Sequence, residues 1–269
     1  MSQASVAISL QGVSKCFHTG TVNEVWPLNG MDLEVSEGAF LMILGGNGSG
    51  KSTLLNAIAG TFPIDQGRIH ISGEDVTRLP EHKRARGIGR VFQNPFTGTA
   101  PSMTVAENLA LAMQRGKHLG LGCSTSRSRR KIFYERVKPL RMDLEYRLDT
   151  PMGTLSGGQR QALTLLMATW TRPKLLLLDE HTAALDPGSA SRILELTQSM
   201  VLESRLTTLM VTHSITQALS LGDRIILMDQ GRIRHDFEGS AKKGLKPETL
   251  LDLFDLGQNA QVISDGKPA

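Results

Sequence analysis

The chain has 269 residues and a formal net charge of +4, and 40% of its residues are hydrophobic. This is the composition of a soluble globular protein that is long enough to bury a full core. No apolar run approaches the roughly 18 residues of a membrane-spanning helix, and no secretion signal is evident at the N-terminus. Cys16 and Cys123 lack metal-ligand spacing and are expected as reduced thiols.

The first forty residues predict an antiparallel sheet. Residues 6–10 and 32–35 alternate apolar and polar side chains, and residues 13–17 end in an aromatic side chain. Phe17 suits two roles, because an aromatic ring can stack on an adenine base or pack into the core at the end of a strand.

A glycine-rich loop then follows an apolar run, residues 40–44, that predicts a buried strand, and residues 54–59 after it predict a helix. The loop matches the G-x-x-x-x-G-K-[ST] phosphate-binding pattern in its required strand–loop–helix context. Its glycines allow backbone N–H groups to point at phosphate oxygens, and the helix start adds a positive dipole. Lys51 supplies a charge for the β- and γ-phosphates, and the Ser52 hydroxyl can ligate Mg²⁺. An incidental glycine-rich turn is the weaker interpretation.

Residues 67–73 predict a short strand, and the basic run at residues 80–86 predicts a solvated helical turn. Residues 88–92 predict a strand that ends at Gln93, where Pro95 directs the chain out of the sheet. Gln93 can reach a metal or an attacking water there, although taken alone it is a surface glutamine.

The sequence pattern changes over residues 97 to about 150, and this segment is predicted to form a mostly helical inserted lobe. Thr104 and Glu107 form a capping box, and the loose residues 116–128 lead into a basic amphipathic helix. The basic face is solvated by default, or it lies near a membrane surface or a partner.

A second anion-binding helix start is predicted at Leu155-Ser156-Gly157-Gly158-Gln159. Ser156 is placed to cap the following helix, residues 162–170, and the two glycines leave backbone N–H groups unobstructed. Two predicted phosphate-binding helix starts in one chain indicate either two phosphate sites or one shared site.

Residues 174–178 predict a buried parallel strand that ends in two carboxylates. Asp179 suits a Mg²⁺ partner, and Glu180 suits a base that orients water. A structural acidic pair is the alternative. The next strand, residues 207–212, ends at His213, which is a candidate sensor of the γ-phosphate or a structural histidine.

The remaining segments complete the predicted domain. Asp186 and Pro187 begin a helix, residues 224–236 form a hairpin around Gln230 and Gly231, and residues 247–254 predict a last helix before a polar tail from residue 257. We therefore expect one domain over residues 5–245 with a lobe at about 97–168, followed by residues 246–269 as a C-terminal helix and tail.

Taken together, the motifs from Phe17 to Gly231 resemble those of the ATP-binding subunit of an ABC transporter. The signature at residues 155–159 is the specific part, because other phosphate-loop enzymes lack it. The resemblance implies an α/β P-loop NTPase of ABC ATPase type, with a mostly parallel core sheet, an N-terminal antiparallel β subdomain and the inserted lobe. It also implies that two cassettes stack head to tail and hold each ATP between the phosphate loop of one and the signature of the other.

Residue roles follow from the same resemblance, with ATP and Mg²⁺ as cofactors. Glu180, His213 and Gln93 take the catalytic roles, and Ser52, Gln93 and Asp179 hold the metal. The residues implied to contact the nucleotide are Phe17, Gly45, Gly46, Asn47, Gly48, Ser49, Gly50, Lys51, Ser52, Thr53, Ser156, Gly157, Gly158 and Gln159. Phe17 stands where tyrosine is frequent, and His181 stands where proline is frequent.

The runs at residues 89–95, 98–104 and 180–186 resemble the ATP-binding components of bacterial tryptophan/tyrosine importers, near the branched-chain amino acid group. This implies import of an amino acid or a similar small solute at the cytoplasmic face of the inner membrane. The implied partners are transmembrane permease subunits, a second and identical cassette and, indirectly, an extracytoplasmic solute-binding protein. No nucleic acid is expected. The alternatives are an exporter ATPase, a soluble ABC-type ATPase acting on nucleic acid or ribosomes, and a phosphate-loop kinase.

Overall fold

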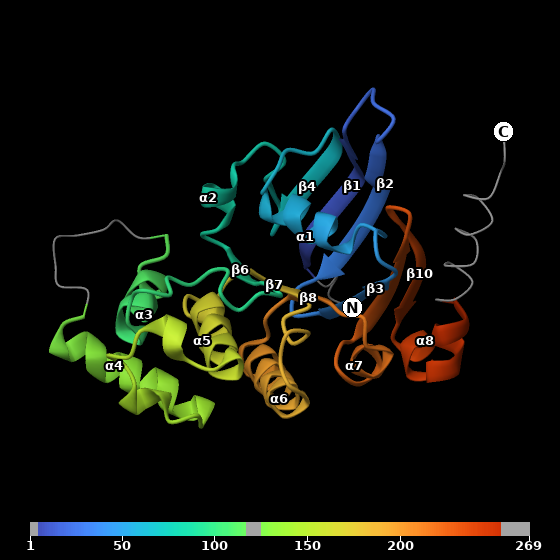
Figure 1. The fold of residues 1–269 in the computed structure, drawn as a ribbon. Helices are drawn as coiled ribbons and strands as arrows, with labels where there is room; N and C mark the ends of the chain where they lie inside the picture. Colours follow the sequence, from blue (N-terminus) through green and yellow to red (C-terminus); the bar gives the residue numbers. More distant parts are fainter. Residues whose placement is uncertain (1–4, 117–124, 254–269) are drawn as a thin grey trace. The chain divides into compact units, whose positions relative to one another are not determined.

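The computed structural model (Figure 1) describes residues 5–116 and 125–253, and Cys123 and the tail from residue 257 lie outside them. The chain divides into two units, one formed by residues 1–84 and 207–269 (unit 1) and one by residues 85–206 (unit 2). Each unit is described by itself. No helix in the described ranges has both the length and the apolar character needed to cross a membrane.

An antiparallel sheet forms the N-terminal part of unit 1, in the order β2-β1-β4-β5. Its strands are β1 (Val6–Phe17), β2 (Val25–Ser36), β4 (Gln66–Ile71) and β5 (Glu74–Asp75). The two strands predicted within residues 6–17 form one strand, whose register with β2 shifts between Leu10 and Val13. The antiparallel subdomain is thus confirmed, and a bulge explains why its alternation is broken.

The remaining strands of unit 1 surround the fully buried β3 (Phe40–Gly45). On its two sides lie β8 (Thr208–Val211) and β9 (Arg224–Asp229), both parallel to it, and β10 (Arg232–Glu238) pairs antiparallel with β9. Three helices accompany these strands: α1 (Lys51–Ala59), α7 (Ile215–Ser220) and α8 (Ser240–Lys243). Residues 247–253 are also helical. Apolar runs therefore mark buried parallel strands here, as predicted.

The short helix α2 (Glu81–Arg84) corrects one prediction about unit 1. Its last residue, Arg84, is only 5% exposed, whereas the sequence predicted a solvated turn. The guanidinium donates hydrogen bonds to the carbonyl oxygens of Ala57 and Ile58, at 2.9 Å each, and to those of Thr77 and Leu79. A cation at the C-terminal end of α1 also complements the helix dipole.

Unit 2 contains the parallel pair β6 (Ile88–Val91) and β7 (Leu175–Asp179) together with most of the helices. The α-helices are α3 (Val105–Met113), α4 (Arg127–Val137), α5 (Gly157–Thr169) and α6 (Pro187–Ser204), and three short 3₁₀ turns lie between α4 and α5. Phe133, Val137 and Leu163 are fully buried in their common core. The apolar face of the basic helix α4 therefore packs within the lobe, as amphipathicity predicts.

Side-chain caps begin three of these helices where the sequence placed them. Capping boxes pair Thr104 with Glu107 at α3 and Ser156 with the glutamine three residues later at α5. At α6 the Asp186 carboxylate accepts from the Ser189 amide, and Pro187 occupies the first helical position. Each such cap stabilises its helix by about 1 kcal/mol.

Candidate functional site

The phosphate loop of unit 1 is shaped by close backbone contacts. Gly50 precedes α1 in a left-handed conformation, with φ +99°, and a Cβ there would collide with the Pro27 carbonyl oxygen. A Cβ on Gly45 would collide with the carbonyl oxygen of Met228 in β9. Glycine is therefore required at both ends of the loop, and the loop is fixed between β3 and its neighbours.

The start of α1 has the character of an anion site. Its N-cap is Gly50, so no side chain caps the first N–H groups of the helix. Lys51 is 6% exposed, and its Nζ donates to the carbonyl oxygens of Gly45 (2.9 Å) and Gly46 (2.8 Å). Within the described chain, the buried Ser49 hydroxyl has no hydrogen-bond partner. A ligand rich in acceptor oxygens, such as a triphosphate, fits this set of donors.

Phe17 lies at the end of β1 and is half-buried. Its ring meets the Phe62 ring edge-on, with centroids 5.3 Å apart. Lys15 Nζ lies 5.4 Å from the centroid of the Phe17 ring and forms a 2.9 Å ion pair with Asp65. The structure thus gives the ring a packing role, and adenine stacking stays a prediction.

His213 stands two residues after β8. Because β8 runs parallel to β3, with Val211 opposite Ile43, this histidine lies at the sheet edge from which the phosphate loop emerges. The residue is exposed, and Ser214 after it caps α7. Unit 1 therefore gathers the phosphate loop and His213 at one edge.

In unit 2 the ends of β6 and β7 lie side by side, with Val91 opposite Leu178. Gln93 therefore follows β6, while Asp179 is the last residue of β7 and Glu180 follows it, at the same edge. Gln93 is exposed, whereas both carboxylates are partly buried. Glu180 has φ +45°, a left-handed conformation that is uncommon for a residue other than glycine.

The sequence motifs assign no role to Gln161, which the structure places between two strand ends of unit 2. It lies on α5, is fully buried, and donates from Nε2 to the carbonyl oxygens of Phe92 (3.3 Å) and His181 (2.6 Å). The available signal was a polar side chain on the buried face of an apolar helix. Only the fold reveals which carbonyl groups it reaches.

His181, which stands where proline is frequent in the family, is fully buried beside Glu180 and has a structural role. Its Nε2 lies 3.0 Å from the Thr197 hydroxyl on α6. Burial lowers the pKa of the imidazole from 6.5 to about 4, so the ring is neutral near pH 7. The residue therefore anchors α6 to the end of β7.

The signature residues combine capping with close packing. The Ser156 hydroxyl accepts from the Gln159 amide (3.2 Å), and the Gln159 side chain accepts from the Ser156 amide (3.3 Å). A Cβ on Gly158 would lie 2.8 Å from the hydroxyl oxygen of Ser189 on α6. A side chain at position 158 would force Ser189 to shift, so Gly158 allows the close approach of two helices, a role distinct from the anion binding that the sequence predicted.

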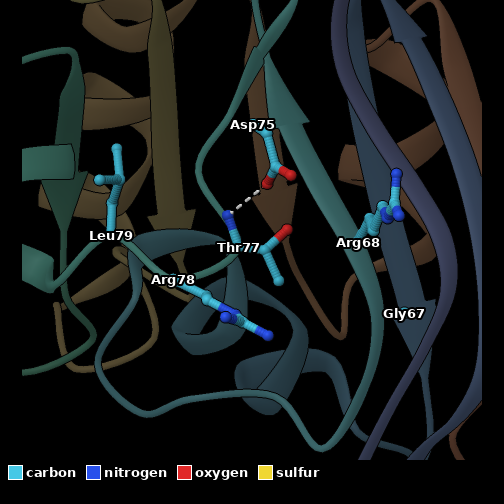
Figure 2. A pocket seen from close by; sticks show the side chains of 6 residues that line it. All are labelled: Gly67, Arg68, Asp75, Thr77, Arg78 and Leu79. Atoms are coloured by element: carbon cyan, nitrogen blue, oxygen red, sulfur yellow. Dashed lines mark hydrogen bonds between the residues drawn. The ribbon is translucent and has the colours of Figure 1, made fainter.

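The described residues of unit 1 line the two surface hollows that follow. The one in Figure 2 has a volume of about 490 Å³ and is lined by Gly67, Arg68, Asp75, Thr77, Arg78 and Leu79. It contains no predicted site residue. The other, of about 550 Å³, is lined by Val25, Trp26, Pro27, Asn29, Gly48, Gln230, Arg232 and Arg234, so it borders the phosphate loop through Gly48.

The buried strand, the glycine loop and the uncapped helix start define a P-loop nucleoside triphosphatase. Residues 28–183 match the family model described as "ABC transporter", and the chain belongs to that family. Members of this family hydrolyse ATP to power transport, so the chain is an ABC ATPase subunit.

Named relatives agree. The chain is 41% identical to the tyrosine transport ATP-binding protein of Clostridioides difficile, and the alignment covers 92% of this chain and 98% of that protein. It is 37% identical to the spermidine/putrescine import ATP-binding protein PotA of Thermobifida fusca, covering 86% of this chain and 57% of PotA.

Solved structures show the same fold. The dimeric cassette MJ0796 bound to ADP and phosphate aligns with a TM-score of 0.74 and 30% identity, covering 86% of this chain and 98% of that one. The cassette MJ1267 in its ADP conformation aligns with a TM-score of 0.76 and 26% identity, covering 94% of this chain and 99% of that one.

Proposed function

We propose that this chain powers the import of an amino acid, with an aromatic amino acid as the first candidate cargo. The support is the 41% identity to a tyrosine transport subunit along nearly all of both chains. Relatives named for bicarbonate or polyamine transport are 35% and 37% identical and are matched over only 32% and 57% of their lengths. The subunit itself does not touch the cargo, so the cargo assignment rests on this similarity.

The proposed chemistry is hydrolysis of ATP by an oriented water. The observation that carries it is the start of α1, where uncapped N–H groups and Lys51 suit the β- and γ-phosphates. Glu180 accepts a proton from the attacking water and orients it. His213 contacts the γ-phosphate, and Phe17 offers its ring to the adenine.

Magnesium is proposed to bind through Ser52, Gln93 and Asp179. Among residues 5–116 and 125–253, no group of three or more His, Cys, Asp or Glu side chains is placed to hold a metal. A set with one carboxylate suits Mg²⁺, which takes much of its shell from phosphate oxygens and water. When bound, the ion neutralises charge on the triphosphate.

A second cassette is proposed to complete each site. The nucleotide in the phosphate loop of the partner cassette is then contacted by the signature residues Ser156, Gly157, Gly158 and Gln159 of this chain. Each chain therefore contacts one nucleotide through its phosphate loop and the other through its signature. The dimer acts with transmembrane permease subunits at the cytoplasmic face of the inner membrane, and a solute-binding protein delivers the cargo.

The test of this proposal compares Glu180→Gln and Lys51→Ala with the exposed control Glu195→Gln on α6. Glu180→Gln should lower turnover by about 10²–10⁴-fold and keep ATP affinity, because only the proton acceptor is lost. Lys51→Ala should abolish tight ATP binding. Full turnover in Glu180→Gln, or unchanged affinity in Lys51→Ala, would reject the assigned roles.

The cargo is tested by reconstituting the subunit with its permeases in vesicles and measuring uptake of labelled tyrosine, a branched-chain amino acid and spermidine. ATP-dependent tyrosine uptake supports the assignment, and uptake of spermidine alone contradicts it. If the chain instead purifies with ribosomes or nucleic acid and without permeases, the soluble ATPase alternative is favoured.

A further inference from the structure

The Gln161 amide joins two strand ends in unit 2. Its Nε2 donates to the carbonyl oxygen of Phe92, which precedes Gln93, and to that of His181, which follows Glu180. The side chain is fully buried. One amide group therefore holds the backbone beside two residues to which the proposed function gives catalytic roles.

The backbone at Glu180 needs such support. Its left-handed conformation, with φ +45°, is disfavoured for a residue with a Cβ and persists only when surrounding contacts impose it. The Ala183 amide donates to the Glu180 carbonyl oxygen (2.9 Å), and Gln161 donates to the next carbonyl oxygen along the chain. These two hydrogen bonds hold the consecutive carbonyl groups of Glu180 and His181, and so they fix the turn.

The imidazole of His181 restrains the same turn from a second helix. Thr197 on α6 donates its hydroxyl proton to the Ile193 carbonyl oxygen (2.8 Å), so His181 must donate to Thr197 from Nε2. Nδ1 of His181 and Oε1 of Gln161 are then buried acceptors, and neither has a partner within the described residues. Unpaired buried acceptors oppose stability, so stability alone does not account for this polar pair.

We propose that Gln161 is a positioning residue that, together with His181, holds Glu180 in the orientation needed for hydrolysis. This inference rests on the proposed function, in which Glu180 orients the attacking water. Gln161 lies four residues after Gly157, about one helical turn from the start of α5. The helix start proposed to serve the partner's nucleotide and the amide that holds this chain's own Glu180 are therefore parts of one rigid segment.

The first test measures steady-state ATP hydrolysis and ATP affinity of the full chain carrying Gln161→Met, which keeps the length of the side chain but removes the donor. We expect kcat to fall about 10–100-fold, as for other residues that orient a catalytic group. ATP affinity should stay unchanged, because α1 and Lys51 are untouched. The control is Thr164→Val, which removes a buried hydroxyl of the same helix that donates only to the Arg160 carbonyl oxygen, and its kcat should stay that of the wild type.

A double-mutant cycle shows whether Gln161 acts through Glu180. In a Glu180→Gln background, adding Gln161→Met should cause no further loss of kcat, because the carboxylate it positions is absent. If the fold-losses of kcat in the two single variants multiply in the double variant, the proposal is overturned. A fully active Glu180→Gln would reject the proposed function instead. A wild-type kcat for Gln161→Met beside an inactive Glu180→Gln would reject the positioning role alone.

A second variant keeps the test decisive if Gln161→Met does not fold. Gln161→Asn retains an amide but shortens the side chain by one methylene, so it cannot reach both carbonyl oxygens. It should fold, as thermal unfolding will show, and lose kcat without losing ATP affinity. Wild-type kcat in a folded Gln161→Asn would overturn the proposal.

Discussion

Arg84 shows how much one side chain contributes to the nucleotide-binding helix. Its guanidinium donates to four carbonyl oxygens, two of them from the last turn of α1, which begins with the phosphate-loop lysine. Burial lowers the pKa of this arginine, and Asp75 opposes that shift. The phosphate-loop motif predicts which residues face the phosphates. The hydrogen bonds from Arg84 to the C-terminal end of α1 could not be predicted from it, because they depend on the fold.

Replacing Arg84 with methionine should destabilise the protein. The buried carbonyl oxygens at the end of α1 would lose their donors, at a cost of about 3 kcal/mol in the free energy of unfolding. Denaturant unfolding measures this change, and the exposed neighbour Lys83→Met is the matched control. Equal stability of the two variants would contradict a structural role for Arg84.

At the scale of elements, apolar runs and caps were predictable because they depend on neighbours in sequence. The buried strands β3 and β7 and the capped start of α3 are confirmed by the structure. Three features were not predictable: the short strand β5, the left-handed turn at Glu180 and the reach of Gln161. The turn at Glu180 and the reach of Gln161 depend on contacts between segments that are distant in sequence, and no local pattern encodes such contacts. The strand β5 instead pairs with the adjacent β4 across a tight turn, with Ile71 opposite Glu74, and it is too short to show an alternating pattern.

The cap of α3 gives a prediction about acid stability. Hydrogen bonds from the Thr104 amide (2.7 Å) and hydroxyl (2.8 Å) lower the pKa of Glu107 below 4.5. The ionised carboxylate therefore stabilises the fold above pH 4.5, and this contribution is lost as the pH falls through the lowered pKa.

The variant Glu107→Gln tests this linkage, since its amide oxygen accepts hydrogen bonds but does not titrate. Thermal unfolding between pH 7 and about pH 3 should show a lower melting temperature at neutral pH and a shallower loss towards acid than in the wild type. Parallel curves for the two proteins would show that this carboxylate contributes nothing to acid sensitivity.

For the whole molecule, the motifs predicted the family because they span most of the chain in a fixed order. The family match over residues 28–183 and the fold of solved cassettes agree with that prediction. The two helix starts that are proposed to bind the nucleotide lie in different units, α1 in unit 1 and α5 in unit 2. In the proposed function each nucleotide contacts the phosphate loop of one copy and the signature of another, so every complete site requires a partner chain.

Mixing two inactive variants measures this dependence most directly. Lys51→Ala disables the phosphate loop, and Ser156→Arg disables the signature, so each variant alone lacks every complete site. A mixed dimer contains one complete site, formed by the intact loop of one chain and the intact signature of the other. We predict that the mixture hydrolyses ATP while neither variant does so alone. A mixture as inactive as its components, or a monomer that works at the speed of the assembled complex, would contradict the shared site.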